Sequence, residues 1–232
     1  MDPDDAVLLT DVFPTGYQAA EMGGIQPGDT VVIFGAGPVG IMAAKSSWLF
    51  GAGRVIVIDE VNYRLEFVRD YAQCEAFNFR EMDDPVVFIK KLIDWIGADV
   101  CIDAVGAEAR GNVLQTITGR KTLLQAGLAT VLGHQLGQER RYGVGCGRIR
   151  ANGQPRTHRQ RSEKGITIRA NQTAVKRHLP KLIDHIQSGR VSPQAIITHR
   201  VPLEEIADAY HIFSEKLDNC IKTVLIPPSA RV

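Results

Sequence analysis

The sequence predicts an α/β fold with a doubly wound parallel sheet and helices on both of its faces. Three observations support this fold class: strands and helices alternate between residues 29 and 105, the strands are apolar on both faces, and a glycine-rich turn follows the first of them. A strand that is apolar on both faces is typical of a parallel sheet covered by helices. The 232 residues are enough to bury such a core.

The individual elements are recognised from apolar runs and the residues that bound them. Strands are expected where β-branched and aromatic residues follow one another, and helices where apolar residues recur on one side of a longer segment. The expected strands are residues 30–34, 54–59, 76–79, 98–105, 195–201 and 220–226. The expected helices are residues 41–50, 62–73, 85–96, 173–188 and 202–216.

The central motif is Gly35-Ala-Gly37-Pro-Val-Gly40, which lies between the first strand and the helix that follows it. Gly35 permits a tight turn, Gly37 lets a pyrophosphate approach the backbone, and Gly40 lets the helix pack closely on the strand. The helix N-terminus supplies free N–H groups and a partial positive charge. Such a motif is weak alone, and a glycine-rich turn without a ligand is the alternative. With strand, helix and a following acid in place, it predicts dinucleotide binding.

That acid is Asp59, nineteen residues beyond Gly40 at the end of the next strand, with Glu60 beside it. Asp59 would accept hydrogen bonds from the adenosine ribose and repel a 2′-phosphate, which favours NAD over NADP. Arg64 could pair with the adenosine side of the cofactor, although an exposed helix charge is an equally good interpretation.

Asp103-Ala-Val-Gly106 ends a later strand, and ligands of doubly wound sheets lie at such carboxyl ends. Val105 and Gly106 are therefore expected to border the nicotinamide half, while a plain strand–loop junction is the alternative. The candidate cofactor-binding residues are Gly35, Ala36, Gly37, Pro38, Val39, Gly40, Asp59, Glu60, Arg64, Val105 and Gly106.

Bulk composition bears on partners and location. A net charge of +1 shows no commitment to nucleic acid, and no apolar run approaches the ~20 residues of a membrane helix. The N-terminus lacks the basic segment followed by an apolar segment that is typical of a signal peptide. The four cysteines are widely spaced. We expect a cytoplasmic protein with a small-molecule substrate and with neither a nucleic-acid nor a membrane partner.

The remaining polar and thiol side chains are given structural interpretations. His178 and His185 lie seven residues apart on one expected helix, but nothing at the right spacing completes a metal site. We interpret the histidines as surface or cap residues. Cys101, inside an apolar strand, is interpreted as a buried thiol.

Three stretches together resemble the zinc-containing medium-chain dehydrogenase/reductase family: residues 8–17 (Leu-Leu-Thr-Asp-Val-Phe-Pro-Thr-Gly-Tyr), residues 25–40, and residues 165–172 (Gly-Ile-Thr-Ile-Arg-Ala-Asn-Gln). The sequences of these stretches are most similar to the glutathione-independent formaldehyde dehydrogenase branch and neighbouring alcohol dehydrogenases. The resemblance covers residues 5–127 and 164–227.

The resemblance implies a Rossmann domain in an NAD-dependent enzyme that oxidises an alcohol or hydrated aldehyde by zinc-assisted hydride transfer. Asp11 stands where the family has a ligand of the catalytic zinc, and Thr15 matches a threonine that touches the nicotinamide ring. Family members are usually homo-oligomers.

Two departures from the family follow. The family's N-terminal catalytic domain, which holds the other zinc ligands, precedes the point where this sequence begins, so we expect no catalytic zinc in this polypeptide alone.

Residues 130–163 carry seven arginines, six glycines and no lysine, with almost no apolar periodicity. When this segment is back-translated into codons and read one base later, the resulting amino-acid sequence is similar to that of the family. This similarity suggests a pair of compensating frameshifts. A genuine arginine-rich insertion or a nucleic-acid arm is the alternative. We expect a disordered or poorly packed stretch there and a destabilised domain.

The chain is accordingly divided into a linker and helix (1–25), the NAD-binding domain (26–172, with 130–163 aberrant), and a C-terminal helix and strands returning to the catalytic domain (173–232). Residues 1–25 and the C-terminal part would be remnants of the interface with a GroES-like catalytic domain. The leading hypothesis is a truncated, inactive copy of a zinc-type dehydrogenase. A non-catalytic dinucleotide-binding module is the alternative, and Asp11 argues against a zinc-free quinone reductase.

Overall fold

The computed structural model describes residues 1–83, 85–93, 98–105, 144–148 and 167–230. The helices are α1 (Pro3–Leu8), α2 (Val12–Gly23), α3 (Pro38–Leu49), α4 (Asn62–Ala72), α5 (Pro85–Leu92), α9 (Val175–Gln187) and α10 (Ile206–Ser214), with short 3-10 turns η1 (Phe79–Glu81), η2 (Pro193–Ile196), η3 (Leu203–Glu205) and η4 (Pro228–Ala230). The strands are β1 (Thr30–Phe34), β2 (Arg54–Asp59), β3 (Glu75–Asn78), β4 (Val100–Asp103), β5 (Val144–Arg148), β6 (Thr167–Asn171), β7 (Ile197–Pro202) and β8 (Lys222–Ile226). None of the described helices combines the length and apolarity needed to cross a membrane.

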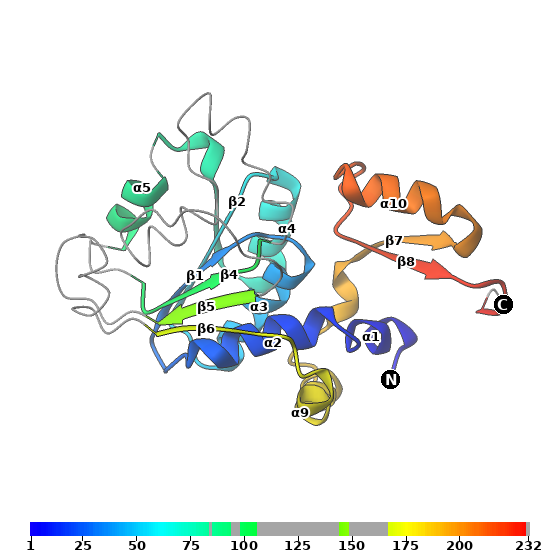
Figure 1. Ribbon diagram of the computed structural model, residues 1–232, viewed down its shortest axis with the longest axis horizontal. Coiled ribbons are helices and arrows are strands. Elements are labelled where there is room, and N and C mark those ends of the chain that lie inside the picture. The colour runs from blue at the N-terminus through cyan, green and yellow to red at the C-terminus, as the bar shows by residue number, and fades with distance from the viewer. Residues whose placement is uncertain (84, 94–97, 106–143, 149–166, 231–232) are drawn as a thin grey trace.

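The main sheet has the strand order β3-β2-β1-β4-β5-β6 (Figure 1). β1 pairs in parallel with both β2 and β4, and β2 pairs in parallel with β3. The chain therefore starts in the middle of the sheet and winds outward in both directions. This confirms the predicted Rossmann-type doubly wound sheet over its first four strands.

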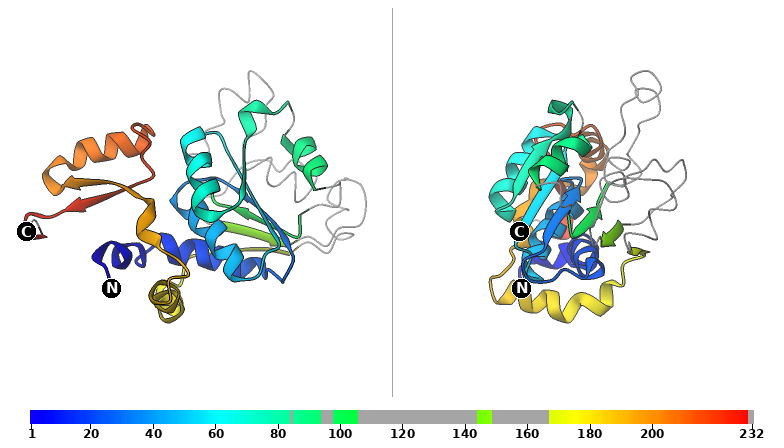
Figure 2. Two further views of the ribbon diagram at one scale, coloured as in Figure 1. Left: turned by 180° about the vertical axis from the view of Figure 1, so that it is seen from behind. Right: turned by 90° about the vertical axis from the view of Figure 1, so that its left-hand side faces the viewer.

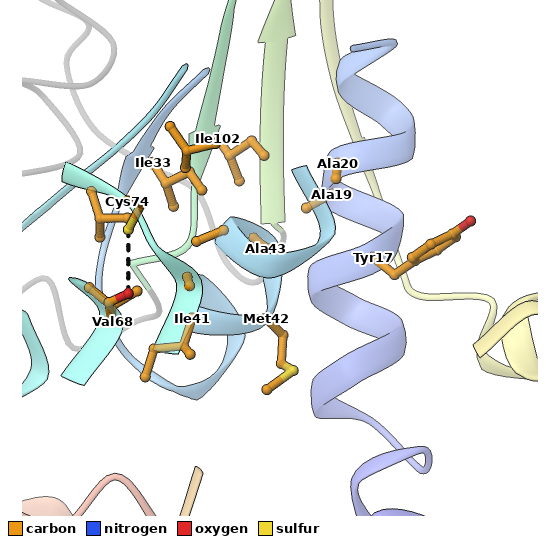
Figure 3. Close-up of a cluster of buried hydrophobic side chains, with 14 of the residues drawn as sticks. Tyr17, Ala19, Ala20, Ile33, Ile41, Met42, Ala43, Val68, Cys74 and Ile102 are labelled. Atoms are coloured by element: carbon orange, nitrogen blue, oxygen red, sulfur yellow. Dashed lines mark hydrogen bonds between the residues drawn. The ribbon is translucent and has the colours of Figure 1, made fainter. Parts of the chain in front are cut away.

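Alternate residues of the central strands enter two different cores. Val31 and Ile33 belong to the larger core with α2, α3, α4 and α9, whereas Val32 and Phe34 belong to the smaller core with α5. In Figure 3, Ile33 and Ile102 extend from the sheet toward Ala43 of α3. The strands β1, β2 and β4 are buried on both faces, as their apolar runs predicted.

The far edge of the sheet differs from the prediction. β5 is antiparallel to β4 and β6 is antiparallel to β5, so this edge is not parallel. These strands read Val-Gly-Cys-Gly-Arg and Thr-Ile-Arg-Ala-Asn and lack the continuous apolar run of β1 and β2. Antiparallel strands tolerate such sequences because one face can meet water. Within the segment 130–163, where a disordered or poorly packed stretch was expected, Val144–Arg148 form the strand β5. The rest of that segment lies outside the described residues.

A second unit follows α9 and consists of β7, α10 and β8, with the two strands parallel to each other. It lies beside α1 and α4 in both views from front and back (Figures 1 and 2). The Tyr63 hydroxyl of α4 donates to the Cys220 carbonyl over 2.8 Å, and Arg200 pairs with Asp4. Contacts with α1 and α4 thus hold the C-terminal unit against the rest of the chain.

The second and third glycines of the predicted motif, Gly37 and Gly40, give a stability test. A Cβ on Gly40 would lie 1.9 Å from the Gly35 carbonyl oxygen, whereas a Cβ on Gly37 meets only an Arg64 guanidinium nitrogen, at 3.9 Å. We predict that Gly40→Ala lowers the free energy of unfolding by roughly 3 kcal/mol, because backbone must move. Gly37→Ala, the matched control, costs no more than about 1 kcal/mol for a poorer helix N-cap. Urea titration measures both, and equal losses would contradict the close-approach argument.

Candidate dinucleotide-binding site

The glycine-rich turn joins β1 to α3 at the carboxyl edge of the sheet. Gly35 has φ +99°, in the left-handed region, and its N–H donates to the Ile58 carbonyl of β2 over 2.8 Å. A Cβ at Gly35 would lie 3.0 Å from the Ala104 carbonyl oxygen, just beyond β4. The turn is therefore wedged between the ends of β2 and β4, where doubly wound sheets bind ligands.

The N-terminus of α3 opens beside this turn. Gly37 is the N-cap and Pro38 the first helical residue, so the amides of Val39 and Gly40 begin the helix. The first N–H groups of a helix have no partner within the helix and carry its partial positive charge. The space around Gly37 is open among the described residues apart from Arg64. A negatively charged group could approach the backbone here.

Asp59 lies at the end of β2 with 6% of its surface exposed. Its Oδ2 accepts the Ala36 N–H at 2.5 Å, and its Oδ1 accepts the N–H groups of Glu60 at 2.6 Å and Val61 at 3.0 Å. The carboxylate thus ties the glycine-rich turn to β2, a structural role that the sequence did not indicate. Each carboxylate oxygen has two acceptor sites. Among the described donors, Oδ2 has one site left for a ribose hydroxyl.

Arg64 projects from the first turn of α4 toward α3. Its side chain is 9% exposed, and its Nε has no hydrogen-bond partner among the described residues. A terminal guanidinium nitrogen lies 3.9 Å from the Cβ position of Gly37. The alternative of an exposed helix charge is therefore wrong. A buried donor without a partner costs about 1–3 kcal/mol, so its retention beside a helix N-terminus points to an anionic ligand.

The other predicted cofactor residues divide into two groups. Val105 lies against the turn, with a methyl carbon 3.2 Å from the Cβ position of Gly35, so the structure brings it to the same edge. Glu60, next to Asp59, is engaged in ion pairs with Arg80 and Lys216. Gly106 lies outside the described residues.

Asp11 and Thr15 lie at the start of α2. The Thr15 hydroxyl donates to the Asp11 carboxylate over 3.1 Å and accepts from the Thr173 hydroxyl over 3.2 Å. The next residue, Gly16, has its Cβ position 2.6 Å from the Ala43 nitrogen, so α2 packs closely on α3. Asp11 and Thr15 therefore lie at the start of the helix that packs on α3.

The residues present do not fit a zinc ion. Asp11 is exposed, and no group of three or more His, Cys, Asp or Glu side chains among the described residues could hold a metal. A catalytic zinc needs about three protein ligands. One carboxylate does not meet that requirement.

A buried polar cluster between α2 and α9 was not predicted from the sequence. The Gln18 Oε1 accepts from the Ala174 N–H at 2.9 Å and contacts the His178 Nε2 at 3.1 Å. His178 is 1% exposed and packs edge-on against Tyr17, so its interpretation as a surface or cap residue is wrong. A signal was present, because His178 precedes the buried Leu182 by one helical turn. Cys101 is buried, as predicted.

The fold and the glycine-rich turn place the chain among the Rossmann-type α/β proteins. Residues 38–144 match the sequence model of the zinc-binding dehydrogenase family. The zinc-type alcohol dehydrogenase-like protein AdhB of Bacillus subtilis (strain 168) is 34% identical over 232 residues, which cover 97% of this chain and 60% of that protein. A glutathione-independent formaldehyde dehydrogenase of the same organism is 42% identical over 47% of this chain and 26% of that protein.

Solved structures of alcohol dehydrogenases also superpose on this chain. The alcohol dehydrogenase TADH from Thermus sp. ATN1 superposes with a TM-score of 0.74 and 26% identity, covering 98% of this chain and 60% of that one. The chain thus spans about 60% of the length of these full-length relatives. The comparisons therefore show that this chain is similar in sequence and in fold to part of the zinc-type alcohol dehydrogenases.

The buried His178 predicts a pH dependence of stability. Burial lowers the pKa of its imidazole below the usual 6.5, against the opposing effect of the Glu21 carboxylate. Below pH 6.5 the unfolded state then binds more protons than the folded state, so the free energy of unfolding falls as the pH drops toward the lowered pKa. We expect the melting temperature to fall by roughly 2–4 °C across this window.

His178→Gln should make this pH profile less steep, and the slope that remains is assigned to His185, whose pKa burial also lowers. The exposed His211→Gln is the control. Thermal melts followed by circular dichroism measure the slopes. Identical slopes for wild type and His178→Gln would remove His178 as the cause.

Proposed function

We propose that this chain binds NAD and is the nucleotide-binding part of a zinc-type alcohol dehydrogenase. The observation that carries the proposal is the buried Arg64 guanidinium, whose Nε has no partner among the described residues, facing the open N-terminus of α3 at Gly37. Two positive features, a guanidinium and a helix N-terminus, converge there. The diphosphate of a dinucleotide supplies the negative charge they lack.

The ribose end is assigned to Asp59. Its remaining acceptor site would take a hydrogen bond from a ribose hydroxyl, and its charge would repel a 2′-phosphate. This favours NAD over NADP. Ala36, Pro38, Val39 and Gly40 complete the turn against which the diphosphate would lie.

The nicotinamide end is assigned to Val105 and Gly106 at the end of β4, with Thr15 of α2 touching the ring. When bound, NAD supplies the hydride acceptor for oxidation of an alcohol or hydrated aldehyde. The family supports a small-molecule substrate, and the short formaldehyde dehydrogenase match is the reason to test formaldehyde first. A homo-oligomeric, cytoplasmic enzyme is part of the same proposal.

Asp11 would be one ligand of the catalytic zinc if other parts of a complete enzyme supplied the rest. A second function, dinucleotide binding without turnover, is favoured by the lack of further ligands near Asp11 among the described residues. Dialysis against zinc followed by metal analysis separates the two. Near-stoichiometric zinc with NAD reduction supports the enzyme, while NAD binding without zinc or turnover supports the module.

The first binding test uses Gly37. We predict that wild-type protein gives a calorimetric binding isotherm with NAD and that Gly37→Ala weakens the affinity about tenfold, because its methyl group occupies the space of the diphosphate. The small stability change expected for this variant keeps the comparison valid. An unchanged dissociation constant would place the diphosphate elsewhere.

The second binding test separates function from folding at Arg64. Arg64→Met keeps the aliphatic volume and removes the charge, so NAD affinity should fall by about tenfold. The free energy of unfolding should stay within about 1 kcal/mol of wild type or rise, because a buried unpartnered donor is removed.

Arg69→Met, on the same helix, is the matched control. Arg69 donates to the Ala76 carbonyl over 2.9 Å, so this variant should lose stability and keep NAD affinity. A loss of stability without a loss of affinity in Arg64→Met would make Arg64 a structural residue.

A further inference from the structure

Charged residues gather where β2 and β3 end. Asp59 and Asn78 are the last residues of these strands and are paired in register. Glu60 follows Asp59, and Arg80 lies two residues beyond Asn78. Both charged side chains therefore belong to the edge to which the proposed function assigns the adenosine ribose.

Glu60 holds two cations at this edge. Its Oε2 accepts from the Arg80 Nε at 2.8 Å and from a terminal Arg80 nitrogen at 2.6 Å. Its Oε1 lies 3.7 Å from the Lys216 Nζ, which comes from the C-terminal unit. One carboxylate thus links β2, the segment after β3 and the end of α10.

The segment around Asn78 sets this geometry. The Asn78 side chain donates to the Glu60 carbonyl over 3.1 Å and accepts from the Arg80 N–H over 2.9 Å. The Arg80 guanidinium also lies 5.0 Å from the centre of the Phe79 ring. Several contacts therefore hold Arg80 in one orientation, although its side chain is partly exposed.

The pair is accessible to a ligand. The side chains of Arg80, Glu60 and Lys216 are 46%, 32% and 33% exposed. An interaction partner arriving from solvent could compete for these cations. The carboxylate of Glu60 decides whether they are available.

We propose that Glu60 is a specificity-determining residue that disfavours NADP by holding Arg80 and Lys216 in ion pairs. This inference rests on the proposed dinucleotide site. A 2′-phosphate brings nearly two negative charges to the ribose next to Asp59. Arg80 and Lys216 are the cations nearest to Glu60 that could neutralise it, and both are already paired with that carboxylate. Asp59 repels the phosphate directly, and Glu60 keeps Arg80 and Lys216 from pairing with the phosphate.

The same two strands provide a matched control at their other ends. Arg54 and Glu75, the first residues of β2 and β3, form an ion pair of the same kind, with nitrogen–oxygen distances of 2.6 and 3.0 Å. This pair lies at the amino edge of the sheet, away from the glycine-rich turn. Glu75→Gln removes the same charge from the same strand pair without touching the proposed site.

The experiment is calorimetry of the full chain with NAD and with NADP for wild type, Glu60→Gln, Arg80→Gln, Glu60→Gln with Arg80→Gln, and Glu75→Gln. Glu60→Gln should raise the ratio of NADP to NAD affinity by about tenfold, because one repulsive charge is lost and two cations are released. Arg80→Gln alone should give no gain, and in the double variant the gain should be clearly smaller than in Glu60→Gln, because only Lys216 is then left to pair with the phosphate. Glu75→Gln should keep the wild-type ratio.

Each outcome separates the two proposals. If wild type binds NAD and Glu60→Gln leaves the ratio unchanged, the role of Glu60 is overturned and the dinucleotide site stands. An equal change in Glu75→Gln, or a gain that persists undiminished in the double variant, would also overturn it. If wild type binds neither nucleotide, the site and the inference fall together. Should Glu60→Gln fail to fold, as a melting curve would show, Glu60→Ala, alone and in the Arg80→Gln background, tests the same coupling.

Discussion

The close approach of α3 to the turn at Gly35 is the constraint on which the site depends. Only a residue without a side chain can stand at position 40, because a Cβ there would overlap the Gly35 carbonyl. This contact carries the N-terminus of α3 to the end of β1, where the carboxyl ends of β2 and β4 also lie. The positive end of a helix is thereby fixed at the sheet edge before any ligand arrives.

The two ends of the proposed cofactor site are prepared in different ways. At the ribose end, Asp59 is already engaged by three backbone N–H groups, so its carboxylate is rigid and its orientation costs nothing on binding. At the diphosphate end, Arg64 is buried with an unused donor, so binding relieves a desolvation cost. Rigidity on one side and an unsatisfied charge on the other both favour an anionic dinucleotide.

Sequence patterns that extend over a few residues predicted the central strands and the glycine-rich turn of the fold. The strands β1, β2 and β4 and the turn at Gly35–Gly40 were predicted because apolar runs and glycine spacing act over a few residues. The Gln18–His178 contact joins residues 160 positions apart, and no short-range pattern contains it. The same holds for the Glu60 pair with Lys216 and for the antiparallel direction of β5. The spacing of Asp59 from the glycine-rich turn predicted a role at the ribose. Its hydrogen bonds to the backbone of that turn and of residues 60 and 61 are seen only in the structure.

The most direct test of the central claim is a titration of isotopically labelled protein with ADP, followed by the backbone amide resonances of residues 36–40. The account predicts that ADP shifts the amides of Gly37, Val39 and Gly40, and that adenosine, which lacks the diphosphate, leaves them nearly unmoved. Shifts of these amides that are equal for ADP and adenosine, or shifts confined to other parts of the chain, would contradict it.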